Sequence, residues 1–235
     1  MRKKLFLFVF TIFITGNVYP QESDFQASDS LKSDFIYWRF SLDGGYSYRM
    51  GKNKEVYPDM KSYAEGLRSG YNISGKAMCY INKYVGFGLN VSVSKYSNEA
   101  DKLNEGREVL KNVSDDITIG YVAPCIELRA VVNERHSFPF DFNVGYLWYN
   151  DEGTVYATVA EISGATVGFG LGAGYDFSII KNIAFGVKMS LLVGRLSSYD
   201  LVLNNSQHKE KIELDSDNYE SLSQFNLSAG VRFNF

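Results

Sequence analysis

The residues that could support catalysis are few and lie in polar connecting segments. Asp200, Ser206 and His208 are close together in the sequence, and an acid, a hydroxyl and an imidazole are the groups of nucleophilic acyl chemistry. They fall in the polar segment 198–220, where no rigid element would hold them in one geometry. The other histidine, His136, lies in a short turn. The sequence therefore predicts no catalytic residue, and a solvated loop histidine is the favoured interpretation of His208.

Metal and nucleotide binding are not predicted either. The stretch 215–218 resembles the start of a Ca²⁺ loop, but it lacks the required glycine and the downstream glutamate spacing. No His/Cys cluster has the spacing of a zinc site. The alternating glycines of 168–174 lack the G-x-G-x-x-G pattern and are better explained by one strand face that must leave room. We therefore expect no cofactor and no metal.

Composition and charge limit the class of protein. The chain has 235 residues, a formal charge of −3 and 15% aromatic residues. Residues 1–20 have the basic start and short apolar run of a secretory signal peptide, and 21–34 reads as a flexible periplasmic leader. Removing the three basic residues at the start changes the charge from −3 to −6, which argues against a nucleic-acid partner. Cys79 and Cys125 are predicted to lie two strands apart, roughly 10 Å, and so to be free.

Residues 35–235 contain eight stretches in which apolar and polar residues alternate. A strict period of two indicates a β-strand with one apolar and one polar face. The stretches are 35–49, 71–81, 85–94, 117–132, 138–149, 164–177, 183–194 and 224–235. Long connections (50–67, 97–116, 150–161 and 198–220) alternate with short turns (82–83, 133–136 and 181–182). In the fourth stretch the apolar parity changes beside Pro124. A one-residue slip there, as in a β-bulge, would reconcile the two halves, and with or without it Glu127 and Arg129 lie on the polar face.

The distribution of charge determines which face is inside. Five basic and four acidic residues share the polar parity and form a predicted interior charge network: Arg39, Asp43, Lys76, Glu127, Arg129, Asp141, Asp176, Lys188 and Arg232. The other residues of that parity are mostly Gly, Ser, Asn and Thr, which suit the narrow interior of eight strands. Buried ions require partners, so these charges should pair with one another. The apolar parity would then face lipid.

Aromatic residues gather near both ends of the predicted strands, as in the interfacial girdles of membrane proteins. One set is Tyr46, Tyr48, Tyr71, Tyr146 and Trp148, and the other is Trp38, Phe138, Tyr175, Phe177, Phe233 and Phe235. Strands of about 9–11 residues tilted by about 45° cross a bilayer. The pattern predicts an all-β fold, an eight-stranded antiparallel up-and-down transmembrane β-barrel with long extracellular loops and short periplasmic turns.

The glycine-rich hairpin 70–94, the glycine alternation 168–174 and the terminal strand 229–235 resemble small eight-stranded outer-membrane β-barrels. The resemblance is to the OmpA/OmpX-like group, and to the outer membrane protein β-barrel domain of Bacteroidetes-type bacteria. It implies an outer-membrane location among lipid and lipopolysaccharide, and a monomer. It also implies that Phe233 and Phe235 form the assembly signal read by the barrel-assembly machinery.

A closed polar interior with a structural or surface-interaction role is the function we expect, because segments 97–116 and 198–220 carry net charges of −3 and −4. The surface ligand is not identified by any motif. A lipid A acyl-modifying enzyme that uses His208 is one alternative, and a narrow transport pore is another. A soluble barrel that binds an apolar ligand is the alternative at the level of fold class.

Overall fold

The computed structural model describes residues 38–51, 58–105, 108–156, 158–203, 210–214 and 219–235. All of them belong to the unit Phe35–Phe235. The predicted signal peptide and leader lie outside the described residues, as do Ser206, His208 and the stretch 215–218.

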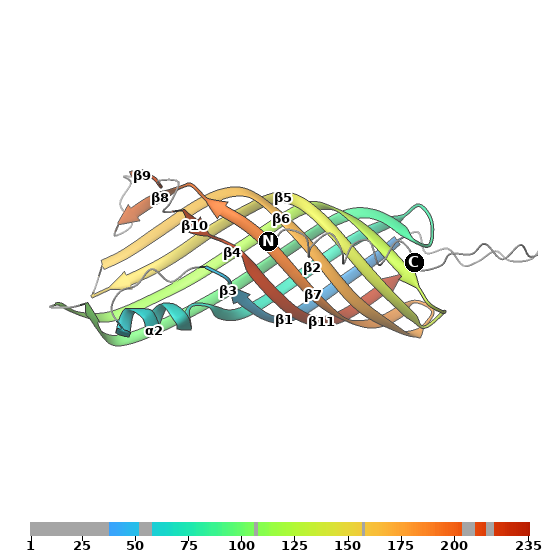
Figure 1. Cartoon of the computed structure of the whole chain (residues 1–235), viewed down its shortest axis with the longest axis horizontal. Coiled ribbons are helices and arrows are strands. Elements are labelled where there is room, and N and C mark those ends of the chain that lie inside the picture. Colours follow the sequence, from blue (N-terminus) through green and yellow to red (C-terminus); the bar gives the residue numbers. More distant parts are fainter. Residues whose placement is uncertain (1–37, 52–57, 106–107, 157, 204–209, 215–218) are drawn as a thin grey trace, which may run out of the picture. The chain divides into compact units, whose positions relative to one another are not determined.

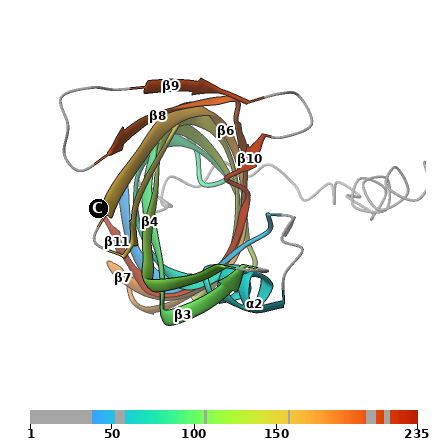
Figure 2. The same ribbon diagram turned by 90° about the vertical axis from the view of Figure 1, so that its left-hand side faces the viewer.

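Eight antiparallel strands form a closed ring, as the sequence predicts (Figures 1 and 2). Their order around the ring is β1 (Trp38–Arg49), β2 (Ser69–Tyr80), β3 (Val85–Glu105), β4 (Glu108–Val131), β5 (His136–Val155), β6 (Thr158–Ile180), β7 (Ile183–Leu196) and β11 (Gln224–Asn234). The ring closes where β11 pairs with β1. Phe235 extends that seam, because its amide donates to the Trp38 carbonyl at 2.9 Å and its carbonyl accepts from the Trp38 amide at 3.3 Å.

Side chains alternate between the interior and the outer surface along each strand of the ring. On β1, Arg39 and Asp43 are each 3% exposed, whereas Phe40 is 45% and Leu42 61% exposed. On β11, Arg232 is 3% exposed and Leu227 51% exposed. The barrel is therefore covered by a belt of exposed apolar side chains, and its polar residues point inward, which is the reverse of a soluble protein.

Four strands are much longer than the sequence pattern predicts. β3, β4, β5 and β6 span 21, 24, 20 and 23 residues, so most of the predicted connections 97–116 and 150–161 are strand. One face of those segments contains few apolar residues, with Leu103 and Val113 buried beside Tyr63. The opposite face carries exposed acids such as Asp116 and Glu152. Correspondingly, the two β-hairpins extend past the aromatic rim as paired strands.

The fourth strand of the ring has no one-residue slip beside Pro124. β4 pairs with β3 in one continuous register from Ile117 to Leu128, with Pro124 opposite Leu89. Ile119, Ala123 and Glu127 all point inward, while Val122, Ile126 and Leu128 are exposed on the outer surface. The inward-facing residues of β4 change from polar to apolar toward the long connections, because the barrel interior is apolar at that end.

The remaining elements lie at the long-connection end. They are helix α2 (Pro58–Gly66) and the short strands β8 (Ser198–Leu203), β9 (Glu210–Glu213) and β10 (Glu220–Ser221). β8 extends the sheet beside β6, β9 pairs with β8, and β10 pairs with the end of β7. No helix in the described ranges has the length and apolar character needed to cross a membrane.

Candidate functional site: the barrel interior and its outer mouth

All nine charged residues of the predicted network lie inside the barrel, each no more than 8% exposed. Asp176 on β6 lies between two guanidinium groups. Arg39 donates to one of its oxygens, and the Nε of Arg232 donates to the other at 3.0 Å. Arg232 also reaches Asp43 at 2.6 Å through Nη1. This cluster crosses the seam between β1 and β11 and joins it to β6.

A second cluster surrounds Lys76 on β2. Its ammonium donates to Glu127 and, at 2.8 Å, to Asp141. Lys188 lies 3.1 Å from the same Asp141 oxygen, and the Tyr80 hydroxyl donates to Glu127. Removing one member of such a buried group leaves an uncompensated charge, so the clusters constrain which strands face each other.

Arg129 is the fifth interior cation, and it borders the second cluster through the ring of Tyr80. Its guanidinium donates to the Lys83 carbonyl at 3.3 and 3.4 Å and lies 4.6 Å from the centroid of the Tyr80 ring. Within the described part of the chain it has no salt bridge. It ties the β2–β3 turn to the barrel wall.

Two small cavities lie in the polar half of the interior. The first, of about 20 Å³, is lined mainly by amide and hydroxyl side chains: Asn72, Ser74, Asn90, Ser92, Asn143, Ser190 and Asn226, with Tyr121, Asp141 and Lys188. The buried Oδ1 of Asn90 has no hydrogen-bond partner among the residues that the structure describes. The second cavity, of about 10 Å³, lies among the charged clusters. These volumes suit about one water molecule each.

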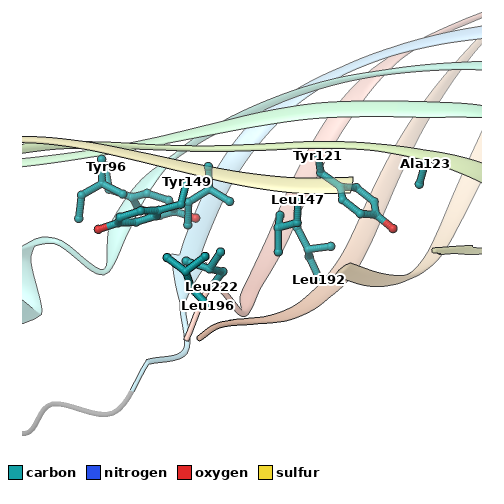
Figure 3. Close-up of a cluster of buried hydrophobic side chains, with 10 residues drawn as sticks. Tyr96, Tyr121, Ala123, Leu147, Tyr149, Leu192, Leu196 and Leu222 are labelled. Carbon is teal, nitrogen blue, oxygen red and sulfur yellow. The ribbon is translucent and has the colours of Figure 1, made fainter. Parts of the chain in front are cut away.

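An apolar layer fills the interior toward the long-connection end (Figure 3). Its buried members come from β3, β4, β5, β7 and the segment before β11: Tyr96, Ile117, Ile119, Tyr121, Ala123, Leu147, Tyr149, Leu192, Leu196 and Leu222. The sequence predicts a polar interior throughout, so this layer corrects that expectation for the outer half. Leu147 and Leu222 are completely buried.

Above this layer, Arg49 lies at the mouth of the barrel between two aromatic rings. Its guanidinium carbon is 5.7 Å from the Tyr96 ring centroid and 6.0 Å from that of Tyr149. It donates to Glu220 at 2.8 Å. The Tyr96 hydroxyl donates to Gln224 inside the barrel. The mouth is thus lined by aromatic and charged groups.

Two acids on the inner face of the extended strands complete the mouth. Asp115 on β4 accepts from the Tyr63 hydroxyl of α2 at 2.8 Å, and Asp151 on β5 accepts from Tyr149 at 2.9 Å. Burial and the neighbouring Asp115 carboxylate raise the pKa of Asp151 to about 6. Burial also raises the pKa of Asp115, and the bond from Tyr63 partly offsets that rise.

The sequence identified the interior charges by their parity but missed Tyr63, Asp115 and Asp151. Both acids lie at positions that continue the inward-facing alternation of β4 and β5. Extending the predicted strands beyond residues 117 and 149 would therefore have placed them on the inner face. Asp200, the acid near His208, lies on β8, and the structure describes neither His208 nor Ser206. In the described ranges no three His, Cys, Asp or Glu residues are grouped to hold a metal ion. Cys79 and Cys125 are free, as predicted.

The sequence matches no family model and no curated protein. Solved structures share its architecture. Neisserial surface protein A aligns with a TM-score of 0.53 and 11% identity, over 86% of this chain and 99% of its own. A major outer membrane protein from Thermus thermophilus aligns with a TM-score of 0.54 and 13% identity, over 84% of this chain and 99% of its own. The outer membrane protein OprG from Pseudomonas aeruginosa aligns with a TM-score of 0.51 and 7% identity, over 85% of this chain and 97% of its own. The fold is that of the small outer-membrane β-barrels.

Proposed function

We propose that this chain is an integral outer-membrane protein that acts at the cell surface and does not conduct solutes. The observation that carries the membrane location is the belt of exposed apolar side chains around all eight strands of the ring. In water, such a surface would far exceed the apolar patches that soluble monomers expose. In a bilayer it contacts lipid, and the closed ring leaves no unpaired strand edge in the hydrocarbon.

The interior supports a non-conducting role. The two cavities have volumes of about 20 and 10 Å³, and the apolar layer that includes Leu147 and Leu192 fills the interior from the first cavity toward the mouth. Planar-bilayer recordings test this role. We expect silent bilayers for the natural chain. Single-channel steps that persist in repeated preparations would instead support the narrow transport pore.

The surface role is supported by a row of acids on the outer face of the extended strands. Asp116 on β4 lies directly opposite Glu152 on β5, and Glu152 lies directly opposite Glu161 on β6. All three are exposed. Like charges directly opposite each other on neighbouring strands destabilise a sheet, so a cationic partner would relieve a repulsion present in the free protein. We propose that this acidic row binds positively charged molecules at the cell surface.

Neutralising the row tests that proposal. The triple variant D116N/E152Q/E161Q should lose most binding of a lysine-rich peptide to cells that display the protein, and its barrel should unfold at the same or a higher temperature. The matched control E65Q/D101N/E210Q removes three exposed acids elsewhere at the same end. Equal loss in both triple variants would contradict a role for the row itself.

A further inference from the structure

The three short turns at the end of the barrel opposite α2 share one composition (Figure 1). They are 81–84 (Ile-Asn-Lys-Tyr), 132–135 (Val-Asn-Glu-Arg) and 179–182 (Ile-Ile-Lys-Asn). Each contains one asparagine, one exposed basic residue and at least one exposed apolar residue. The exposed apolar side chains are Ile81, Tyr84, Val132, Ile179 and Ile180, at 49–66% exposure. The basic residues are Lys83, Arg135 and Lys181.

Hydrogen bonds hold these turns in fixed conformations. The Asn82 side chain accepts from the amides of Tyr84 and Val85 at 2.8 and 2.9 Å. Asn133 accepts in the same way from the amides of Arg135 and His136, both at 2.9 Å. Two such carboxamide turns therefore present Lys83 and Arg135 at defined positions on the rim.

The remaining contacts tie the same turns to the barrel wall. The buried Arg129 donates to the Lys83 carbonyl, and the Ser178 amide of β6 donates to the Arg135 carbonyl at 2.8 Å. The Asn182 carbonyl accepts from the Asn234 amide of β11 at 2.9 Å. The three basic residues therefore lie on an ordered rim and not on independent loops.

The apolar side chains of the turns continue the outer belt past its aromatic rim. Phe177 is 37% and Phe235 67% exposed at that rim, and Ile179 and Ile180 are each 56% exposed at the register shift that ends the pairing of β6 with β7. Side chains in this arrangement contact the acyl chains, while lysine and arginine side chains extend to the level of the lipid headgroups.

Charge complementarity identifies the headgroup. The turns carry three basic residues and one acid, Glu134, whereas the segments 97–116 and 198–220 at the other end have net charges of −3 and −4. A basic residue near a membrane surface is attracted to anionic lipid, and added salt screens that attraction. Zwitterionic headgroups offer no such net attraction.

We propose that the three short turns bind anionic phospholipid headgroups in the leaflet that contacts this end of the barrel. Lys83, Arg135 and Lys181 contact the phosphates, and the neighbouring apolar side chains enter the hydrocarbon boundary. This inference rests on the proposed membrane location, because it applies only to a barrel that is inserted in a bilayer.

Tryptophan quenching by brominated lipid tests the proposal directly. The chain has two tryptophans. Trp38 lies at the short-turn rim, where its carbonyl accepts from the Phe235 amide, so W148F leaves it as the single reporter. The W148F protein is inserted into phosphatidylcholine vesicles that contain a minor fraction of either brominated phosphatidylglycerol or brominated phosphatidylcholine. We expect roughly two-fold or stronger enrichment of the brominated phosphatidylglycerol around Trp38 at low salt, decreasing as salt is added.

Variants identify the residues responsible. K83Q/R135Q/K181Q in the same background should quench equally with both brominated lipids. K95Q/K102Q/K111Q, which removes three basic residues at the long-connection end, should keep the preference for phosphatidylglycerol. An electrophoretic shift between unheated and boiled samples shows that each variant has inserted. Insertion without lipid preference in W148F would overturn this inference alone, whereas failure of W148F and of the natural chain to insert would overturn the proposed membrane location.

Discussion

At the level of single residues, Asp176 is the buried carboxylate that pairs with two arginines at once. It is 1% exposed and accepts from Arg39 and Arg232, which come from the two strands that close the ring. Without it, Arg39 would be buried with no salt bridge among the described residues, and Arg232 would keep only Asp43. The free energy of unfolding should therefore depend strongly on this one carboxylate.

We expect D176A to lower the free energy of unfolding by about 3–5 kcal/mol, because it leaves a buried cation uncompensated. Urea titration of the refolded barrel, followed by tryptophan fluorescence, measures the change. D200A on the peripheral strand β8 is the control and should change stability by less than about 0.5 kcal/mol. A D176A barrel as stable as the natural one would show that the cluster does not contribute to folding.

Asp151 should make the stability of the barrel depend on pH. Its pKa of about 6 lies above the ordinary value of 3.8 for an aspartate. The folded chain therefore binds this proton more tightly than the unfolded chain, so the contribution to stability is present below about pH 4 and is lost as pH rises through 6. The difference in unfolding free energy between D151N and the natural chain should grow between pH 4 and 7. A difference that stays constant over that range would contradict the proposed burial of Asp151 beside Asp115.

At the scale of elements, β11 is the strand that closes the ring. Its final contacts are the paired hydrogen bonds between Phe235 and Trp38 and the edge-to-face contact of the Phe235 ring with Phe40, at 6.0 Å between centroids. The predicted alternation of 224–235 matches the observed strand closely, because one face contacts the interior network and the other the outer surface throughout its length.

Deleting Phe235 should impair assembly, because it removes the last pairing of the seam and a belt aromatic. We expect the fraction of chain that becomes heat-modifiable to fall several-fold on refolding and in cells. F235L keeps the backbone pairing and an apolar side chain, so it should assemble better than the deletion. Efficient formation of the barrel by the deletion variant would contradict a role for this residue in assembly.

The other strands show where prediction from sequence ends. Period-two patterning located all eight strands of the ring because each crosses the belt, where inside and outside differ in polarity. Beyond the belt, the outward Glu152 and the inward Asp151 both meet polar surroundings, so alternation disappears while the backbone pairing continues. In the half of the interior near the long connections, Ile117 and Ile119 point into an apolar layer. Apolar residues of β4 therefore face inward there, whereas nearer the short turns they face outward.

At the scale of the whole molecule, the barrel has two chemically different ends and a filled interior. Charged clusters occupy the half near the short turns, and an apolar layer with an aromatic, charged mouth occupies the other. The interior network could be predicted from parity alone, because the charges of an eight-stranded barrel have few other places to lie. The mouth could not, because its residues come from six separate segments that the fold brings together: α2, β1, β3, β4, β5 and β10.

We infer that the apolar belt is embedded in the outer membrane. Fractionation of cells that produce the full chain, followed by electrophoresis of unheated and boiled membrane samples, tests it most directly. We expect the chain to be recovered in the outer-membrane fraction, to resist extraction by alkaline carbonate and to migrate differently before and after boiling. Recovery of the folded chain in the soluble periplasmic fraction would contradict the claim and would instead indicate a soluble barrel.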